Sequence, residues 1–148
     1  MIRPSTRARY ALRAMIELAL HEDAGPMLLR DVAHAQRISP KYLEQLVIPL
    51  RRAGLLQAER GPHGGYELAK PAAEIAAGEI IEAVEGPLDL LDCVRSAQAC
   101  DRSRTCAAQR LWSRASQAMN DVLYGTTLAD LRQEQLAAQR ETAPCYQI

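Results

Sequence analysis

The chain has 148 residues, the size of one ordinary domain or of a small domain with a dimerisation arm. Apolar residues make up 48% and charged residues 24%, which excludes a disordered chain, and no segment approaches the 18 uncharged apolar residues of a membrane span. The net charge is zero, but residues 1–70 carry 11 Lys and Arg against 7 Asp and Glu, so this charge does not exclude a nucleic-acid partner for that half.

The N-terminal region predicts two helices. The first residues are charged without the apolar run of a signal peptide, so we expect a cytoplasmic protein with no membrane partner. Apolar side chains then recur at helical spacing over residues 5–21, where Ser5 or Thr6 can act as N-cap. A second short helix fits residues 29–36. With no Phe in the chain, this core must be built from aliphatic side chains, which favours helices.

A third helix and a hairpin follow. Ser39 is a good N-cap, and Pro40 suits the first position of a helix that runs to about residue 53. Residues 55–59 and 66–70 resemble two short strands, and the turn between them is rich in glycine. Two short helices joined by a tight turn indicate a helix-turn-helix, and a β-hairpin directly after the second helix indicates a wing.

The second half predicts two more helices around a cysteine segment. A helix fits residues 72–84, the cysteine segment spans 88–106, and a long helix covers about 107–123. Its apolar stripe consists of Leu111, Ala115, Ala118 or Met119, and Val122, with Trp112 and Leu123 beside it. The stripe is either core of its own domain or a contact with a partner helix. We favour a homodimer, because winged domains usually bind two half-sites about one DNA turn apart.

The predicted fold class is mainly α with a small β-hairpin wing, in which a winged helix-turn-helix domain precedes a long C-terminal dimerisation helix. The expected regions are a DNA-binding domain at 1–86, a cysteine-rich cluster-binding loop at 87–106, a dimerisation region at 107–132 and a tail at 133–148.

The DNA-reading surface is predicted from the third helix and the wing. Its candidate residues are Ser39, Lys41, Tyr42, Glu44, Gln45, Arg51, Arg60, Gly64 and Gly65. Gln45 can pair with adenine, Lys41 with guanine or phosphate, and Glu44 with cytosine N4. Arg51 suits the DNA backbone, and Arg60 suits a narrow minor groove. Any one of these side chains is better explained as part of a solvated face, but their combined order indicates double-stranded DNA as partner.

Three cysteines follow the pattern Cys93-x6-Cys100-x5-Cys106, and Cys145 lies far away. This spacing lacks the short knuckles of structural zinc sites, and disulfides are rare in the cytoplasm. Soft thiolates in a loop suit an iron–sulfur cluster, although the spacing is not a common ferredoxin pattern. From spacing alone, a cluster remains open against zinc or free thiols.

Several motifs together resemble the Rrf2 family of winged-helix regulators, which includes IscR-, NsrR- and RirA-like proteins. The motifs are Arg9-Tyr10-Ala11, Tyr42-Leu43-Glu44-Gln45, the LRRAGL stretch at 50–55 and the wing motif Arg60-Gly61-Pro62-His63-Gly64-Gly65-Tyr66. The resemblance covers residues 5 to about 132. It implies a homodimeric repressor or activator whose cluster lies between the DNA-binding domain and the dimerisation helix, with Glu44, Gln45 and Arg60 in DNA-reading positions.

The fourth cluster ligand is where the sequence departs from this family. IscR-like proteins place a His three residues after the third cysteine, where this chain has Gln109. NsrR-like proteins use an acidic residue in the first helix, at a position that aligns with Arg9. Asp92, Asp101 and Cys145 remain candidates. A cubane held by three thiolates leaves one reactive iron, so the resemblance favours a labile 4Fe–4S sensor, with 2Fe–2S as the alternative.

Three functions fit these residues to different degrees. The leading hypothesis is a cluster-gated transcription regulator that senses iron, redox state or nitric oxide. The second is a cluster-free regulator of the same fold that uses thiol oxidation or a protein partner. The third is a redox electron carrier, which has no use for a basic wing. The sequence contains no constellation of acid, base and nucleophile, so we expect no enzyme activity.

Overall fold

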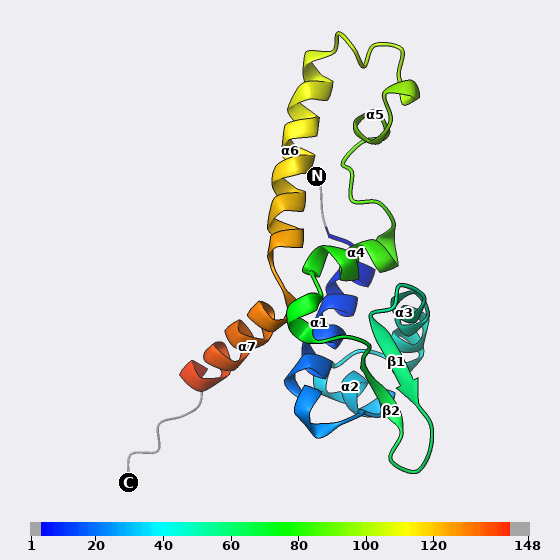
Figure 1. The fold of residues 1–148 in the computed structure, drawn as a ribbon, viewed down its shortest axis with the longest axis vertical. Coiled ribbons are helices and arrows are strands. Elements are labelled where there is room, and N and C mark those ends of the chain that lie inside the picture. Colours follow the sequence, from blue (N-terminus) through cyan, green and yellow to red (C-terminus); the bar gives the residue numbers. More distant parts are fainter. Residues whose placement is uncertain (1–3, 143–148) are drawn as a thin grey trace.

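The computed structural model describes residues 4–142 and consists of a winged-helix unit from which a long helix projects (Figure 1). The winged unit contains α1 (Thr6–Leu20), η1 (Glu22–Ala24), α2 (Leu29–Gln36), α3 (Pro40–Arg52), β1 (Leu56–Glu59), β2 (Gly65–Leu68), η2 (Ala72–Glu74) and α4 (Ala77–Glu85). It is followed by α5 (Asp92–Arg95), η3 (Ala97–Ala99), α6 (Ala107–Gly125) and α7 (Leu128–Thr142). The predicted fold class is confirmed.

Local capping sets the helix starts of the winged unit as predicted. The Ser5 hydroxyl accepts a hydrogen bond from the Ala8 amide at 3.1 Å and caps α1. The Ser39 hydroxyl accepts from the Tyr42 amide at 3.4 Å, and Pro40 begins α3. Gly54 follows α3 with a φ of +73°, a conformation that glycine adopts without a steric penalty.

The wing is a two-stranded antiparallel sheet in which Leu56 pairs with Leu68 and Glu59 with Gly65. A third segment joins it, because the amide and carbonyl of Met27 both bond to Tyr66, at 2.9 and 2.7 Å. The wing therefore rests on the chain that precedes α2.

The helix predicted over residues 72–84 is interrupted in the structure. It divides into η2 and α4 because Ile75 and Ala76 are extended and pair with the α6–α7 junction. The Ile75 carbonyl accepts from the Leu128 amide at 2.7 Å, and the Thr126 carbonyl accepts from the Ala77 amide at 2.9 Å. These tertiary hydrogen bonds replace the helical ones that sequence periodicity anticipates.

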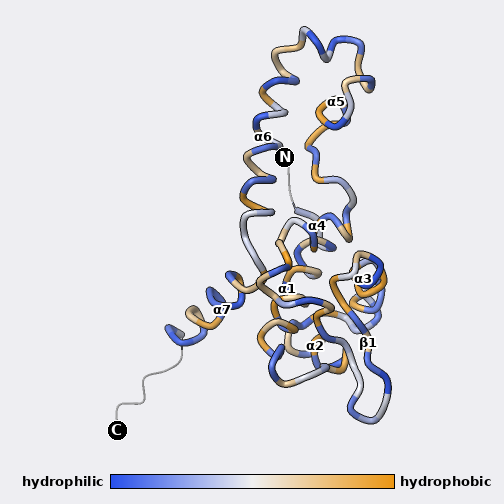
Figure 2. Tube along the Cα trace, in the orientation of Figure 1, coloured by the Kyte–Doolittle hydropathy of each residue, from blue (hydrophilic) through white to orange (hydrophobic). Residues whose placement is uncertain are grey.

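The hydrophobic core lies between α1, α2, α3 and α4, where apolar segments converge in Figure 2. Its fully buried side chains include Met15, Leu43, Leu50 and Ile80. A further member, Leu128, comes from α7 and has no exposed surface. Helix α7 is not predicted from the sequence, and it extends to Thr142, into the segment at 133–148 that was expected to be a tail.

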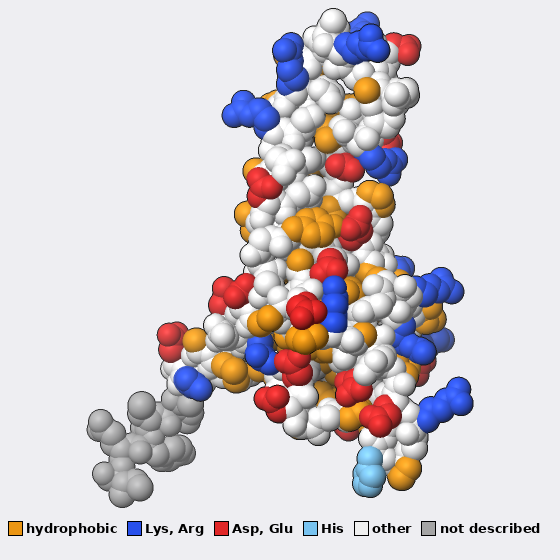
Figure 3. Space-filling view, in the orientation of Figure 1, with side chains coloured by type: hydrophobic (Ala, Val, Ile, Leu, Met, Phe, Trp, Pro, Cys, Tyr) orange, Lys and Arg blue, Asp and Glu red, His pale blue; other side chains and the backbone are white. Residues whose placement is uncertain are grey.

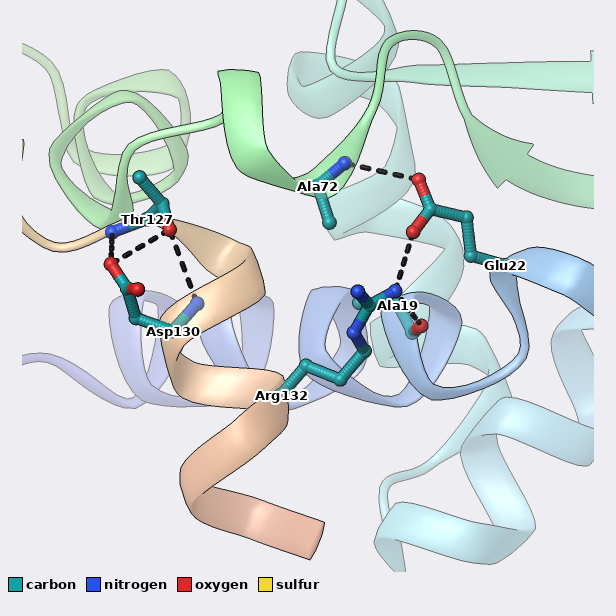
Figure 4. A network of polar contacts seen from close by, with 6 residues as sticks. All are labelled: Ala19, Glu22, Ala72, Thr127, Asp130 and Arg132. Carbon is teal, nitrogen blue, oxygen red and sulfur yellow. Dashed lines mark hydrogen bonds and ion pairs between the residues drawn. The ribbon is translucent and has the colours of Figure 1, made fainter.

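A polar network attaches α7 to the winged unit (Figure 4). The Glu22 carboxylate accepts from the Ala72 amide at 3.0 Å and from the Arg132 guanidinium at 2.6 Å. Thr127 and Asp130 cap α7 reciprocally, since each donates its backbone amide to the other's side chain, at 2.9 and 3.1 Å. Helix α7 is thus attached by both apolar and charged contacts.

The base of α6 packs against α4 through an aromatic ring. A Cβ atom at Gly78 would lie 2.8 Å from the Tyr124 ring, so only glycine permits this approach. The Tyr124 hydroxyl donates to Glu82. Burial, followed by the hydrogen bond to Glu82 and the negative charge of that residue, raises the pKa of Tyr124 to about 12. Within residues 4–142, no helix combines the length and apolarity needed to cross a membrane.

Candidate functional site: the DNA interface and the cysteine loop

Helix α3 buries one face and exposes another. Leu43, Leu46, Val47 and Leu50 enter the core, and Lys41, Glu44, Gln45, Ile48, Arg51 and Arg52 lie on the exposed face. The side chains predicted to touch bases and phosphates are therefore accessible along one edge of the molecule. Among them, Ile48 is a large apolar side chain that the sequence analysis did not single out, and such a side chain can contact a thymine methyl group.

Tyr42 is less exposed than the other predicted DNA-reading residues of α3. Its ring is half-buried and meets the Tyr10 ring edge-on, with centroids 5.9 Å apart and planes at 84°. The guanidinium carbons of Arg9 and Arg13 each lie 5.5 Å from the Tyr10 centroid. The first turn of α3 thus rests on an aromatic and cationic surface of α1.

An open hollow of about 490 Å³ lies between the N-terminal ends of α1 and α3. It is lined by Thr6, Tyr10, Arg37, Ile38, Ser39, Lys41, Tyr42 and Gln45. The hollow lies at the starts of two helices, which carry a partial positive charge, and two basic side chains, Arg37 and Lys41, line it, so it can accept a phosphate. Arg37 was missed at the sequence level, although its place in the turn before Ser39 was a usable signal.

Arg60 is exposed and begins the turn between β1 and β2. The two glycines predicted to contact DNA also have a structural role. A Cβ atom at Gly64 would lie 2.3 Å from the Glu59 carbonyl oxygen, and one at Gly65 would lie 2.3 Å from the Met27 carbonyl oxygen. Both contacts are with backbone, which cannot move aside as a flexible side chain can.

We therefore expect Gly65→Ala to displace the wing from the Met27 segment. The strain should lower the free energy of unfolding by about 1–3 kcal/mol, the usual cost of overpacking a close contact. Urea unfolding monitored by circular dichroism measures this. Gly125→Ala is the matched control, because a Cβ atom there meets nothing within 4 Å. A Gly65→Ala protein as stable as the wild type would contradict the close approach.

Charge is distributed unevenly over the surface. In Figure 3, Lys and Arg side chains gather along the side that carries α3 and the wing, and also at the tip beside the start of α6. On the face drawn, acidic side chains lie around α4, beside α7 and over the lower part of the winged unit. The first of these basic regions coincides with the predicted DNA-reading surface, which is where phosphate contacts require it.

The three cysteines lie on the segment that joins α4 to α6, at the end of the molecule far from the wing (Figure 1). Cys93 is in α5 and half-buried, Cys100 follows η3 and is exposed, and Cys106 is the N-cap of α6. All three are free thiols. Cys145 lies outside the described residues.

Gln109 connects two of the cysteine positions. Its backbone amide donates to the Cys106 sulfur at 3.4 Å, and its side-chain amide donates to the Cys93 carbonyl at 3.2 Å. The residue found where IscR-like proteins have a histidine therefore lies within the cysteine loop. A glutamine amide is a hydrogen-bond donor and a weak oxygen ligand, so it stabilises the loop without adding a soft metal ligand.

The donors suit an iron–sulfur cluster in kind but are not gathered around one. Three thiols on one loop match the soft ligands that such clusters require. Across the described part of the chain, however, no three His, Cys, Asp or Glu side chains come close enough to hold a metal ion. Asp92, a candidate fourth ligand, instead pairs with Arg95 at 2.9 Å, and Asp101 is exposed. Holding a cluster would require the segment from Cys93 to Cys106 to close around it.

Comparison with known proteins agrees with this architecture. The HTH-type transcriptional regulator IscR of Serratia proteamaculans is 41% identical over 130 residues, which cover 88% of this chain and 79% of that protein. The chain in the structure of T. potens IscR is 33% identical to this one. The match covers 98% of this chain and 95% of that chain, with a TM-score of 0.78. The structure of CymR, the global cysteine regulator of B. subtilis, is 40% identical, covers 90% and 98% respectively, and has a TM-score of 0.77.

The family comparison covers most of the chain. The Rrf2 family model, described as an iron-dependent transcriptional regulator, matches residues 4–134. The IscR and CymR proteins similar to this chain are transcriptional regulators and not enzymes. The match includes the helix-turn-helix, the wing, the cysteine loop and α6. The chain belongs to the Rrf2 family of transcriptional regulators.

Proposed function

We propose that this protein is a homodimeric DNA-binding regulator that senses iron, redox state or nitric oxide through a labile iron–sulfur cluster on Cys93, Cys100 and Cys106. The observation that carries the proposal is the position of the three free thiols, on one loop that ends at the N-cap of α6. Any change that closes or opens this loop acts directly on the first turn of the helix proposed to join two protomers.

DNA binding by α3 and the wing is supported by exposure and charge. Lys41, Glu44 and Gln45 are exposed in the first turns of α3, where helix-turn-helix proteins contact base edges. Arg51, in the last turn of α3, and Arg60, in the wing turn, are also exposed and suit phosphates or the minor groove. Ser39, Gly64 and Gly65 support this surface by capping α3 and by keeping the wing close to its neighbours.

The homodimer is supported by the outward face of α6. Leu111 and Val122 are 60% and 66% exposed, and Ala115 and Ala118 lie between them on the same face. These four positions at helical spacing form an apolar stripe, of which three residues are exposed and Ala115 is half-buried. The small alanines at its centre would let two helices approach closely.

Charges beside the stripe favour an antiparallel pair of α6 helices. Arg114 and Asp121 line the same shallow hollow as Leu111 and the two alanines, Arg114 toward the start of α6 and Asp121 toward its end. An antiparallel arrangement centred on the alanines brings Arg114 near the partner's Asp121. A parallel arrangement would instead place like charges together.

The cluster would be held by the three thiolates. Gln109 would hold the two ends of the loop, since it is hydrogen-bonded to Cys93 and to Cys106. When bound, such a cluster supplies iron that reacts with oxygen or nitric oxide and is lost when iron is scarce. A 4Fe–4S cluster on three thiolates is favoured over 2Fe–2S, because one weakly held iron accounts for lability. For this to act as a switch, the loaded and empty forms must differ in affinity for DNA.

Anaerobic purification tests the proposal. We expect a coloured wild-type protein that contains iron and sulfide, and whose affinity for a DNA duplex selected from a random pool changes when the cluster is removed. Cys93→Ser, Cys100→Ser and Cys106→Ser should each lose iron, while Cys145→Ser, the control, should retain it. A colourless protein, or equal DNA affinity with and without cluster, would rule out cluster-dependent sensing. Loss of iron in Cys145→Ser would assign it as the fourth ligand.

A second candidate function is a cluster-free regulator that responds through its thiols or a protein partner. It is favoured by the dispersed cysteines and by the similarity to CymR, the global cysteine regulator. Iron content that is unaffected by Cys93→Ser, together with a change in DNA affinity on mild thiol oxidation, would support this alternative.

A further inference from the structure

Gln36, the last residue of α2, is hydrogen-bonded to two residues that lie one turn apart on α1. Its side-chain nitrogen donates to the Glu17 carboxylate at 2.6 Å, and its side-chain oxygen accepts from the Arg13 Nε at 3.0 Å. The Arg13 guanidinium also donates to the Gln36 backbone carbonyl. We name Arg13, Glu17 and Gln36 the Gln36 clamp. A side-chain amide with a partner on both its nitrogen and its oxygen has one defined orientation.

The anchor of this clamp is a mostly buried carboxylate. Glu17 is only 9% exposed, in contrast to the exposed Arg13. Besides Gln36, its carboxylate faces the His21 ring at 3.6 Å. A buried carboxylate needs hydrogen-bond donors, so Glu17 strongly favours the position in which the Gln36 amide reaches it.

The clamp lies immediately before the turn that leads into α3. Arg37 has a φ of +53°, a left-handed conformation that residues other than glycine adopt reluctantly, and the Ile38 side chain is buried. Ser39 then caps α3. With only two residues between Gln36 and this cap, the position of Gln36 determines where the first turn of α3 begins.

A second connection joins the clamp to α3 directly. The Arg13 guanidinium that holds Gln36 also lies over the Tyr10 ring, which meets the Tyr42 ring of α3 edge-on. The clamp therefore contacts the end of α2 on one side and supports the first turn of α3 on the other. Lys41 and Gln45, which flank Tyr42 in α3, line the hollow at the same place.

We propose that Gln36 is a positioning residue for DNA recognition, which sets the orientation of α3 without itself touching DNA. The inference rests on the proposed DNA-reading role of α3 and is independent of the cluster. Losing the clamp should weaken binding to a matched sequence, where base contacts depend on angle. Binding to unrelated DNA depends mainly on phosphates and should change little.

Two variants and a stability control test this. Gln36→Met keeps the length of the side chain and removes both hydrogen bonds, while Gln36→Glu places a second carboxylate against Glu17. The double variant Glu17→Gln with Gln36→Glu restores an amide–carboxylate pair with its direction reversed. Ile75→Val removes one buried methylene from a side chain outside the clamp and serves as the control for stability.

The readout is the ratio of dissociation constants for unrelated and matched duplexes, where the matched duplex is selected by the wild-type protein from a random pool. Proteins are compared anaerobically at equal iron content and equal salt. We expect Gln36→Met and Gln36→Glu to reduce the ratio about tenfold, the value of one base contact, with an unchanged salt dependence. The double variant should recover most of the ratio, and Ile75→Val should retain all of it.

An unchanged ratio in Gln36→Met, or an equal fall in Ile75→Val, would overturn the positioning role while leaving DNA binding established. Failure of the double variant to exceed Gln36→Glu would also count against the clamp. If the wild-type protein selected no duplex at all, both the proposed DNA function and this inference would fail.

Discussion

Val122→Asp is expected to convert the proposed α6-mediated dimer to a monomer and to weaken binding to a two-half-site duplex by about 100-fold or more. The substitution places two charges within an apolar contact that excludes water, which is costly unless each charge finds a partner. A monomer then contacts a single half-site, and specific affinity falls toward that of unspecific binding. Analytical ultracentrifugation and DNA titration measure the two effects.

The orientation of the α6 helices can be tested by exchanging charges. In an antiparallel pair, Arg114→Asp alone should weaken the dimer up to about tenfold, because it opposes the partner's Asp121 in two symmetric places. Combining it with Asp121→Arg should restore the dimer. In a parallel pair the single variant would only replace one like-charge contact with another. A monomer–dimer constant that does not respond to either change would contradict the antiparallel arrangement.

Leu128→Ala is expected to lower the free energy of unfolding by about 2–5 kcal/mol, the range for a large aliphatic side chain removed from a packed core. Leu128 is fully buried among side chains of the winged unit, although it belongs to α7. Its loss should also loosen the α6–α7 junction, whose backbone is hydrogen-bonded to Ile75. Urea unfolding monitored by circular dichroism measures the change.

Leu136→Ala is the matched control for this experiment, since Leu136 lies on the same helix and is 38% exposed. We expect its effect to stay below about 0.5 kcal/mol, as for most surface substitutions. Similar losses in both variants would mean that α7 contributes through helicity alone and that Leu128 is not part of the core.

Elements set by neighbouring residues were predictable from the sequence. Ser5, Ser39 and Pro40 start helices, and Gly54 ends one, because caps and breakers act within a single turn of chain. The apolar spacing over residues 5–21 predicted that α1 buries one face for the same reason. The glycine-rich turn predicted the hairpin, whose observed strands share the end at Glu59 with the prediction and differ by one or two residues at the other three ends.

Contacts between distant segments were not predictable in this way. Glu22 and Arg132 are 110 residues apart in the sequence, and no local period relates them. Helix α7 could have been found from the Thr127-x-x-Asp130 capping pattern, but its attachment to the core could not. Similarly, the Gln36 clamp joins three ordinary surface residue types that only become partners when α1 and α2 pack together.

The sequence by itself determined the winged helix-turn-helix, its basic N-terminal half and the three thiols of the cysteine segment, because these depend on residue type and local spacing. Only the tertiary structure decided that the helix at 72–84 breaks, that Leu128 completes the core, and that the stripe on α6 faces outward. Hydrophobic burial and pairing of buried polar groups are properties of the whole packed chain, so they override local periodicity where the two conflict.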